Sequence, residues 1–128
     1  SMIAGLASAG VASTLMRSAA AQQSTSSADV MRDALGDMAF ALATSQLATQ
    51  RAENALVRTF AQMETEEQMA FTEARRMAGL TLPSPSMMDT GEQQLMQQLQ
   101  SARGAEFDRM YVQGQIRGDN DLLQTHQA

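Results

Sequence analysis

The chain has 128 residues, of which 44% are hydrophobic and 18% are charged, and its formal net charge is -5 at pH 7. This length supplies one hydrophobic core and is too short for two ordinary domains. All 9 basic residues are arginine and only Arg75 and Arg76 are adjacent, so the sequence offers no basic face for phosphates and nucleic-acid binding is excluded. The absence of cysteine excludes a disulfide framework and a thiolate metal site.

Residues 3–16 form an apolar run rich in alanine, glycine and serine, and the "SAAAQQ" that follows contains the Ala-x-Ala pattern that signal peptidase prefers. We therefore expect residues 1–28 to comprise a signal-like or tethering segment and a Ser-rich linker. The alternative is that residues 3–21 form a helix of the mature protein. Because the apolar run is shorter than the ~20 residues that a bilayer demands, any membrane contact through residues 3–21 is expected at the surface.

A helical period follows the Ser-rich stretch "QQSTSSAD". Ser27 or Asp29 is the expected N-cap, since either side chain accepts hydrogen bonds from the first free backbone N–H groups. Apolar residues then recur at spacings of three and four, which is typical of an amphipathic helix. This pattern predicts a helix from about residue 29 to 51, with Asn54 as the hinge or cap after it.

The second predicted helix starts near Ala55 and ends at Gly79, where "GLTLPSPS" supplies a glycine and two prolines. Its main stripe is expected to face the interior of the fold. That stripe comprises Leu56, Phe60, Met63, Glu67, Ala70, Ala74 and Met77, with Val57, Glu64 and Phe71 beside it.

Two further helices are predicted after the prolines. The third is expected from Glu92 to about Ala102, and the fourth from there to the end of the chain. Gly114 and Gly118 lie on the predicted inner stripe of the fourth helix and cost roughly 1 kcal/mol each relative to alanine. The close approach of a neighbouring backbone is the expected compensation.

Four amphipathic helices with short connections predict an all-α fold, an antiparallel four-helix bundle over residues 29–128 with an extra small-residue segment before it. Methionine is frequent, with 11 residues. Because these methionines fall on the expected inner faces, we predict a deformable core rich in thioether groups.

Several segments resemble those of the bacterial domain-of-unknown-function family 4142. They are "SQLATQRA", "VRTFAQMETEEQ", "GLTLP" and "FDRMYVQGQI", and the resemblance spans about residues 36–124. It implies a ferritin-like bundle that is exported to the periplasm or cell envelope, and it brings no established reaction. Family members commonly carry a histidine a few residues after the "FD..Y" segment, where this chain has Asp119 or Asp121 instead.

A ferritin-like fold raises the question of a di-iron site. Such a site takes a Glu from each of two helices and a Glu-x-x-His pair from each of the other two. This sequence has 1 histidine, His126, and the predicted helix over residues 29–51 contains no glutamate. One chain therefore lacks the ligands for paired iron.

Carboxylates suggest a different kind of site. Glu64 and Glu67 are three residues apart on one helix, and Asp108 with Asp119 or Asp121 on the last helix are candidates to approach them. Oxygen ligands of this type suit a hard divalent cation.

The alternative is an ordinary helix surface without a metal. In that interpretation Glu66 and Glu73 are solvated, because charged side chains are rarely buried without a partner. Glu64 or Glu67 then turns inward and pairs with an arginine, for which the candidates are Arg51, Arg58 and Arg109.

The sequence contains no recognisable catalytic constellation. His126 near the C-terminus has no rigid setting beside a nucleophile, and "AGLASAG" lacks the preceding strand and the lysine of a phosphate-binding loop. We therefore predict a non-enzymatic exported bundle without a cofactor, whose partner is a second copy or another envelope protein. The alternative function is binding of a divalent cation or small ligand by carboxylates of the bundle.

Overall fold

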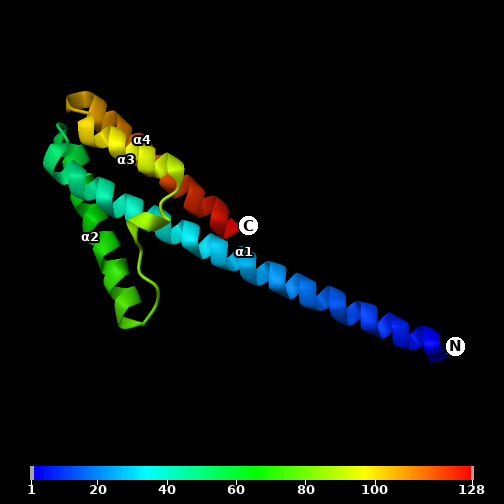
Figure 1. The fold of residues 1–128 in the computed structure, drawn as a ribbon. Helices are drawn as coiled ribbons and strands as arrows, with labels where there is room; N and C mark the ends of the chain where they lie inside the picture. The colour runs from blue at the N-terminus through cyan, green and yellow to red at the C-terminus, as the bar shows by residue number, and fades with distance from the viewer. Residues whose placement is uncertain (1, 128) are drawn as a thin grey trace. The chain divides into compact units, whose positions relative to one another are not determined.

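The computed structural model describes the backbone of residues 2–127 and the side chains of residues 27–118. The described residues form four α-helices and no strand (Figure 1): α1 (Met2–Arg51), α2 (Ala55–Met77), α3 (Thr90–Ser101) and α4 (Gly104–Gln127), with a short 3-10 helix η1 (Pro85–Met87) before α3. The predicted all-α fold is confirmed. The chain divides into two compact units, Ser1–Met31 and Arg32–Ala128.

The helix start predicted at residue 29 was wrong. Helix α1 begins at Met2 and continues through the Ser-rich stretch, so neither Ser27 nor Asp29 caps it. Residues 11–35 contain no glycine or proline, and serine and threonine are only modestly unfavourable inside a helix. The residue types in this stretch therefore do not interrupt the helix. The signal-like or tethering role of residues 1–28 stays a prediction.

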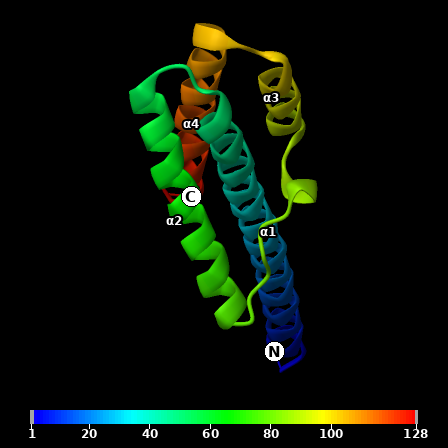
Figure 2. The same ribbon diagram turned by 90° about the vertical axis from the view of Figure 1, so that its left-hand side faces the viewer.

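The second unit is an antiparallel bundle. Its four helices are residues 32–51 of α1 followed by α2, α3 and α4, and successive helices run in opposite directions (Figure 2). Among the described residues, no helix combines the length and the apolar character needed to cross a membrane.

The corner between α1 and α2 has the cap that the sequence predicted. Asn54 is the N-cap of α2, and its side-chain Oδ1 accepts hydrogen bonds from the backbone N–H groups of Leu56 at 2.8 Å and Val57 at 3.2 Å. The other end of α2 is also confirmed, because Gly79 has a φ of 70°, a conformation that favours glycine. Asp89 and Glu92 then form a reciprocal capping box at the start of α3.

Glycines in two helices mark close contacts. A Cβ atom at Gly36 of α1 would lie 2.2 Å from the backbone oxygen of Met87 in η1, so only glycine lets these two backbones approach. At Gly114 of α4 the neighbours are side chains, with Leu95 Cδ2 at 2.8 Å from the Cβ position. Gly118 has nothing within 4 Å. The prediction that a neighbouring backbone approaches Gly114 and Gly118 was therefore wrong. Such a close approach occurs at Gly36 instead.

The core is built from small and aromatic residues. Its buried cluster comprises Ala48, Ala52, Ala61, Leu99, Phe107 and Tyr111. None of the methionines among residues 27–118 is fully buried, and Met63 and Met77 are 64% and 82% exposed. The predicted methionine-rich core was therefore wrong. Alanines on α1 and α2 let these helices pack closely around the rings of α4, which leaves little room for longer side chains inside.

Candidate functional site

Helix α2 presents its apolar stripe to solvent. Leu56 is 80% exposed, whereas Ala61 is 0% and Gln68 is 8% exposed. The inward orientation predicted for this stripe was wrong for Leu56, Met63 and Met77. Phe60 is partly exposed but keeps a ring contact with the buried Tyr111, with the ring centroids 6.2 Å apart. We call the exposed set the outer stripe of α2, and it comprises Leu56, Phe60, Met63, Ala70, Phe71, Ala74 and Met77.

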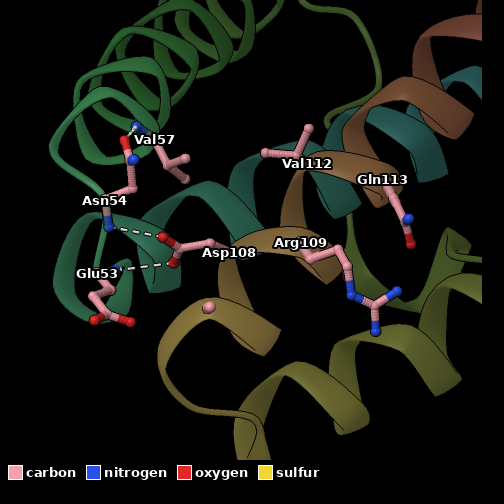
Figure 3. A pocket seen from close by; sticks show the side chains of 8 residues that line it. Glu53, Asn54, Val57, Asp108, Arg109, Val112 and Gln113 are labelled. Carbon is pink, nitrogen blue, oxygen red and sulfur yellow. Dashed lines mark hydrogen bonds between the residues drawn. The ribbon is translucent and has the colours of Figure 1, made fainter.

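The start of α2 explains this orientation. Asp108 of α4 accepts hydrogen bonds from the backbone N–H groups of Glu53 at 2.9 Å and Asn54 at 2.7 Å (Figure 3). These bonds hold the corner that precedes α2, and they set which residues of its first turns face the bundle. Val57 and Ala61 then pack on the core. Rotation of the helix to bury Leu56 would break this arrangement.

The side of α2 that faces the bundle is partly polar, and so are the helix faces around it. Tyr111 Oη of α4 lies 2.8 Å from Ser45 Oγ of α1, and the two share a hydrogen bond. Gln115 Nε2 donates to Thr44 Oγ1 at 2.8 Å, and Thr44 Oγ1 donates to the backbone oxygen of Phe40 at 2.7 Å. Two buried side-chain hydrogen bonds therefore join α4 to α1 inside the bundle, one from Tyr111 and one from Gln115.

Helix α2 adds an amide and a carboxylate to this interior. Gln68 Nε2 donates to Glu64 Oε1 at 3.1 Å, while Gln68 Oε1 is buried without a hydrogen-bond partner. Burial raises the pKa of Tyr111 to about 12; the Ser45 hydroxyl acts to lower that pKa, and the charge of Glu64 acts to raise it. Glu64 is thus the glutamate of "ETEE" that faces inward.

An open cleft of about 650 Å³ lies between the start of α2 and the first half of α4. Val57 and Val112 point into it from the two helices (Figure 3). Its full lining is Glu53, Asn54, Val57, Ala105, Asp108, Arg109, Val112 and Gln113. Two apolar walls with a few polar groups suit a small ligand or a side chain of a partner.

The charged groups beside the cleft are mostly engaged already. Arg109 Nη2 lies 2.5 Å from Glu106 Oε1, one turn away on α4. This hydrogen bond and the opposite charges lower the pKa of Glu106 and raise the pKa of Arg109. Both side chains are more than half exposed, so water screens the pair and it contributes little to stability.

Three of the four residues predicted for a cation site have side chains that the structure describes, and their surroundings differ. Glu64 is half-buried and faces inward, Glu67 is exposed, and both oxygens of the Asp108 carboxylate accept backbone hydrogen bonds at the corner. The side chain of Asp119 lies outside the described residues, as do those of Asp121 and His126. Within residues 27–118 no group of three or more histidine or acidic side chains is placed to hold a metal ion. The cation site stays a prediction.

The arginines named as possible partners of glutamate have backbone contacts. Arg58 Nη1 donates to the carbonyls of Ala52 at 3.0 Å and Glu53 at 2.9 Å. Arg51 Nη1 donates to the carbonyl of Gln100 in α3. These bonds satisfy carbonyl groups near the end of α1 and in the last turn of α3, so both arginines help to hold the bundle together at this end.

Sequence reasoning missed Thr44 and Gln115 as interior residues. Their signal was weak, because polar residues on a predicted helix are ordinarily assigned to the solvent side. The spacing of Tyr111 and Gln115, four residues apart on α4, is the one local feature that places both on one face.

The fold and the two surfaces described above define an all-α bundle with an open cleft at one end and a long exposed apolar stripe on one helix. The chain belongs to the family described as Domain of unknown function (DUF4142), whose model matches residues 12–128. No curated protein and no solved structure matches the chain.

Proposed function

We propose that this protein is a non-enzymatic, exported bundle that acts by binding another protein through the outer stripe of α2. The observation that carries the proposal is the exposure of large apolar side chains along this helix, with Met63 at 64% and Met77 at 82%. Single exposed apolar residues are common on soluble proteins, but several large ones along one face of a helix mark an interaction surface.

The size of the stripe supports a protein as the partner. Helix α2 has 23 residues, and at about 1.5 Å per residue the stripe from Leu56 to Met77 is roughly 30 Å long. That length matches a helix or a groove on another protein and exceeds most small molecules. Apolar anchors at helical spacing are the usual means by which one helix docks against another.

Polar side chains of α2 face inward while large apolar ones are exposed, and this contrast supports a binding role for the outer stripe. Gln68 and Glu64 occupy inward places where Leu56 or Met63 would gain more from burial. The bundle therefore forgoes part of its own hydrophobic stabilisation. A binding role for the stripe accounts for that arrangement.

Export and a ferritin-like arrangement belong to the same proposal. They rest on the family resemblance and on the signal-like pattern "SAAAQQ" in residues 18–23. Fractionation of cells that produce the protein from its natural gene tests the location. We expect the protein in the periplasmic or envelope fraction, and recovery in the cytoplasm alone contradicts export.

Site-specific photo-crosslinking in those cells tests the contact. A photoactivatable residue at position 63 is expected to give one discrete product, identified by mass spectrometry. The matched control is position 69, because Met69 is also 54% exposed but lies about 120° around the helix from Met63. Equal labelling from both positions, or none from position 63, contradicts a role for the outer stripe.

A cation inside the bundle is the second candidate function, and one observation favours it. Gln68 Oε1 is a buried oxygen without a partner, and it belongs to a side chain that also contacts the Glu64 carboxylate. Carbonyl and carboxylate oxygens are the ligands that hard cations prefer. Native mass spectrometry of protein purified without chelator tests it, since no bound ion and no thermal shift with divalent ions contradict this candidate.

A further inference from the structure

Two methionines of the outer stripe of α2 are open to solutes in water. Met63 is 64% exposed and Met77 is 82% exposed. At about 100° per residue the two side chains lie within about 40° of each other around the helix. Met69 is also exposed, at 54%, but it lies outside the stripe, about 120° around α2 from Met63.

The sulfur atom is what methionine adds to such a surface. Leucine has a similar volume and a similar preference for helices, and Leu56 already serves as an exposed apolar residue of the stripe. Methionine carries a polarizable thioether that leucine lacks, and this group is oxidised to a sulfoxide. Met63 and Met77 therefore combine an apolar contact surface with a reactive group.

A peroxide is the class of oxidant that this chemistry requires. A lone pair of the thioether sulfur attacks one oxygen of hydrogen peroxide, the O–O bond breaks, and the other oxygen leaves as water after a proton transfer. The sulfur is oxidised by two electrons and gains one bond to oxygen, and the peroxide is reduced by the same two electrons. The chain has no cysteine, so no thiol within it competes for the oxidant.

Oxidation at these two positions spares the core. The buried core cluster and the partly buried residues packed on it include neither Met63 nor Met77. A sulfoxide at either position is hydrated and displaces no core side chain. The outer stripe does change, because a polar hydrogen-bond acceptor replaces an apolar thioether at two of its positions.

We infer that Met63 and Met77 are reversible oxidation sites that control the outer stripe, with the thioethers binding the partner and the sulfoxides binding it more weakly. The control of binding rests on the proposed function of the stripe, whereas the oxidation itself does not. A sulfoxide oxygen buried against an apolar partner lacks a hydrogen bond, which lowers the affinity. Reduction by a methionine sulfoxide reductase restores the apolar surface.

Peptide mass spectrometry of the purified chain, after timed exposure to hydrogen peroxide, tests the two sites. We expect Met63 and Met77 to be oxidised at least about threefold faster than Met96 and Met110, which are only partly exposed, because the peroxide must reach the sulfur. The circular dichroism spectrum is expected to stay helical, and treatment with the reductase to restore the original masses. Equal rates at the four positions, or loss of helix as residues 63 and 77 are oxidised, overturn the inference.

Photo-crosslinking from position 56 tests the control of binding. Leu56 is 80% exposed, and a photoactivatable residue at its position leaves both methionines in place. Treatment of the cells with hydrogen peroxide before irradiation is expected to lower the yield of the crosslinked product at least about fivefold. In the M63L/M77L variant the yield is expected to be the same with and without peroxide, because leucine keeps the apolar surface and is not oxidised.

The control M69L removes an exposed thioether outside the stripe, and its product is expected to stay sensitive to peroxide. Sensitivity that persists in M63L/M77L means that peroxide acts elsewhere, for example on the partner, and overturns the inference. A product in untreated cells that peroxide leaves unchanged overturns the inference alone. If position 56 and position 63 both give no product in untreated cells, the proposed function is contradicted, and the control of binding with it.

Discussion

The hydroxyl groups of Tyr111 and Ser45 share a hydrogen bond of 2.8 Å between two residues that are both 0% exposed. The bond joins α4 to α1 across 66 positions of sequence. Because both residues are fully buried, the tyrosine hydroxyl depends on Ser45 for its hydrogen bond.

Substitution of either partner is expected to destabilise the bundle. S45A leaves the tyrosine hydroxyl buried, and we expect a loss of about 1–3 kcal/mol in the free energy of unfolding. Y111F is expected to cost less, because a serine inside a helix is able to donate to the carbonyl four residues before it. Urea denaturation of both single variants and of the double variant measures the coupling. The double variant should be destabilised by less than the sum of the single effects, and strict additivity contradicts the hydrogen bond.

The pKa of Tyr111 predicts a loss of stability at high pH. Burial raises this pKa to about 12 from the ordinary tyrosine value of 10.0. The unfolded chain therefore ionises first, so the stabilisation is fully present below about pH 10 and is lost as the pH rises towards about 12. The loss is on the order of 2 kcal/mol.

The same residue offers a direct measurement of that pKa. The chain has 1 tyrosine and no tryptophan, so an ultraviolet absorbance titration reports Tyr111 alone. We expect a midpoint well above that of the urea-unfolded chain. Y111F should lose less stability than the wild type above pH 10, and identical pH profiles for the two proteins contradict the assignment.

Two glycine substitutions are expected to have opposite effects. G36A places a Cβ atom 2.2 Å from the backbone oxygen of Met87, and we expect a loss of about 2 kcal/mol or more because backbone must move. G118A meets nothing within 4 Å and is expected to stabilise α4 by about 0.5–1 kcal/mol. Thermal unfolding monitored by circular dichroism compares the two, and a neutral G36A means that η1 does not pack on α1.

Asp108 is expected to hold the corner between α1 and α2. D108A removes the acceptor for the N–H groups of Glu53 and Asn54, and we expect a loss of about 2–3 kcal/mol. D108N keeps one oxygen and should lose less. Hydrogen exchange measures protection of the two amides directly, and fast exchange in the wild type contradicts the contact. The control E106A alters only the exposed pair with Arg109 and should leave these amides protected.

Local signals in the sequence were sufficient to predict where most helices end. Asn54 caps α2, Gly79 stops it and Glu92 lies in the first turn of α3, as their residue types indicate. Each of these effects acts within one helical turn, so neighbouring residues contain the necessary information. The start of α1 was missed because serine and threonine only weakly oppose a helix, and the surrounding residues favour one.

Only the tertiary structure decided which side of α2 faces the bundle. The apolar period predicts an amphipathic helix but also predicts that Leu56 and Met63 face inward, and the structure exposes both. Asp108 of α4 holds the two residues before α2 and so fixes the rotation of the helix. Its hydrogen bonds join residues that are 54 and 55 positions apart in the sequence. The sequence by itself determined the helices and most of their ends, because those depend on local interactions. The exposed stripe and the polar interior depend on contacts between distant segments, which no local pattern contains.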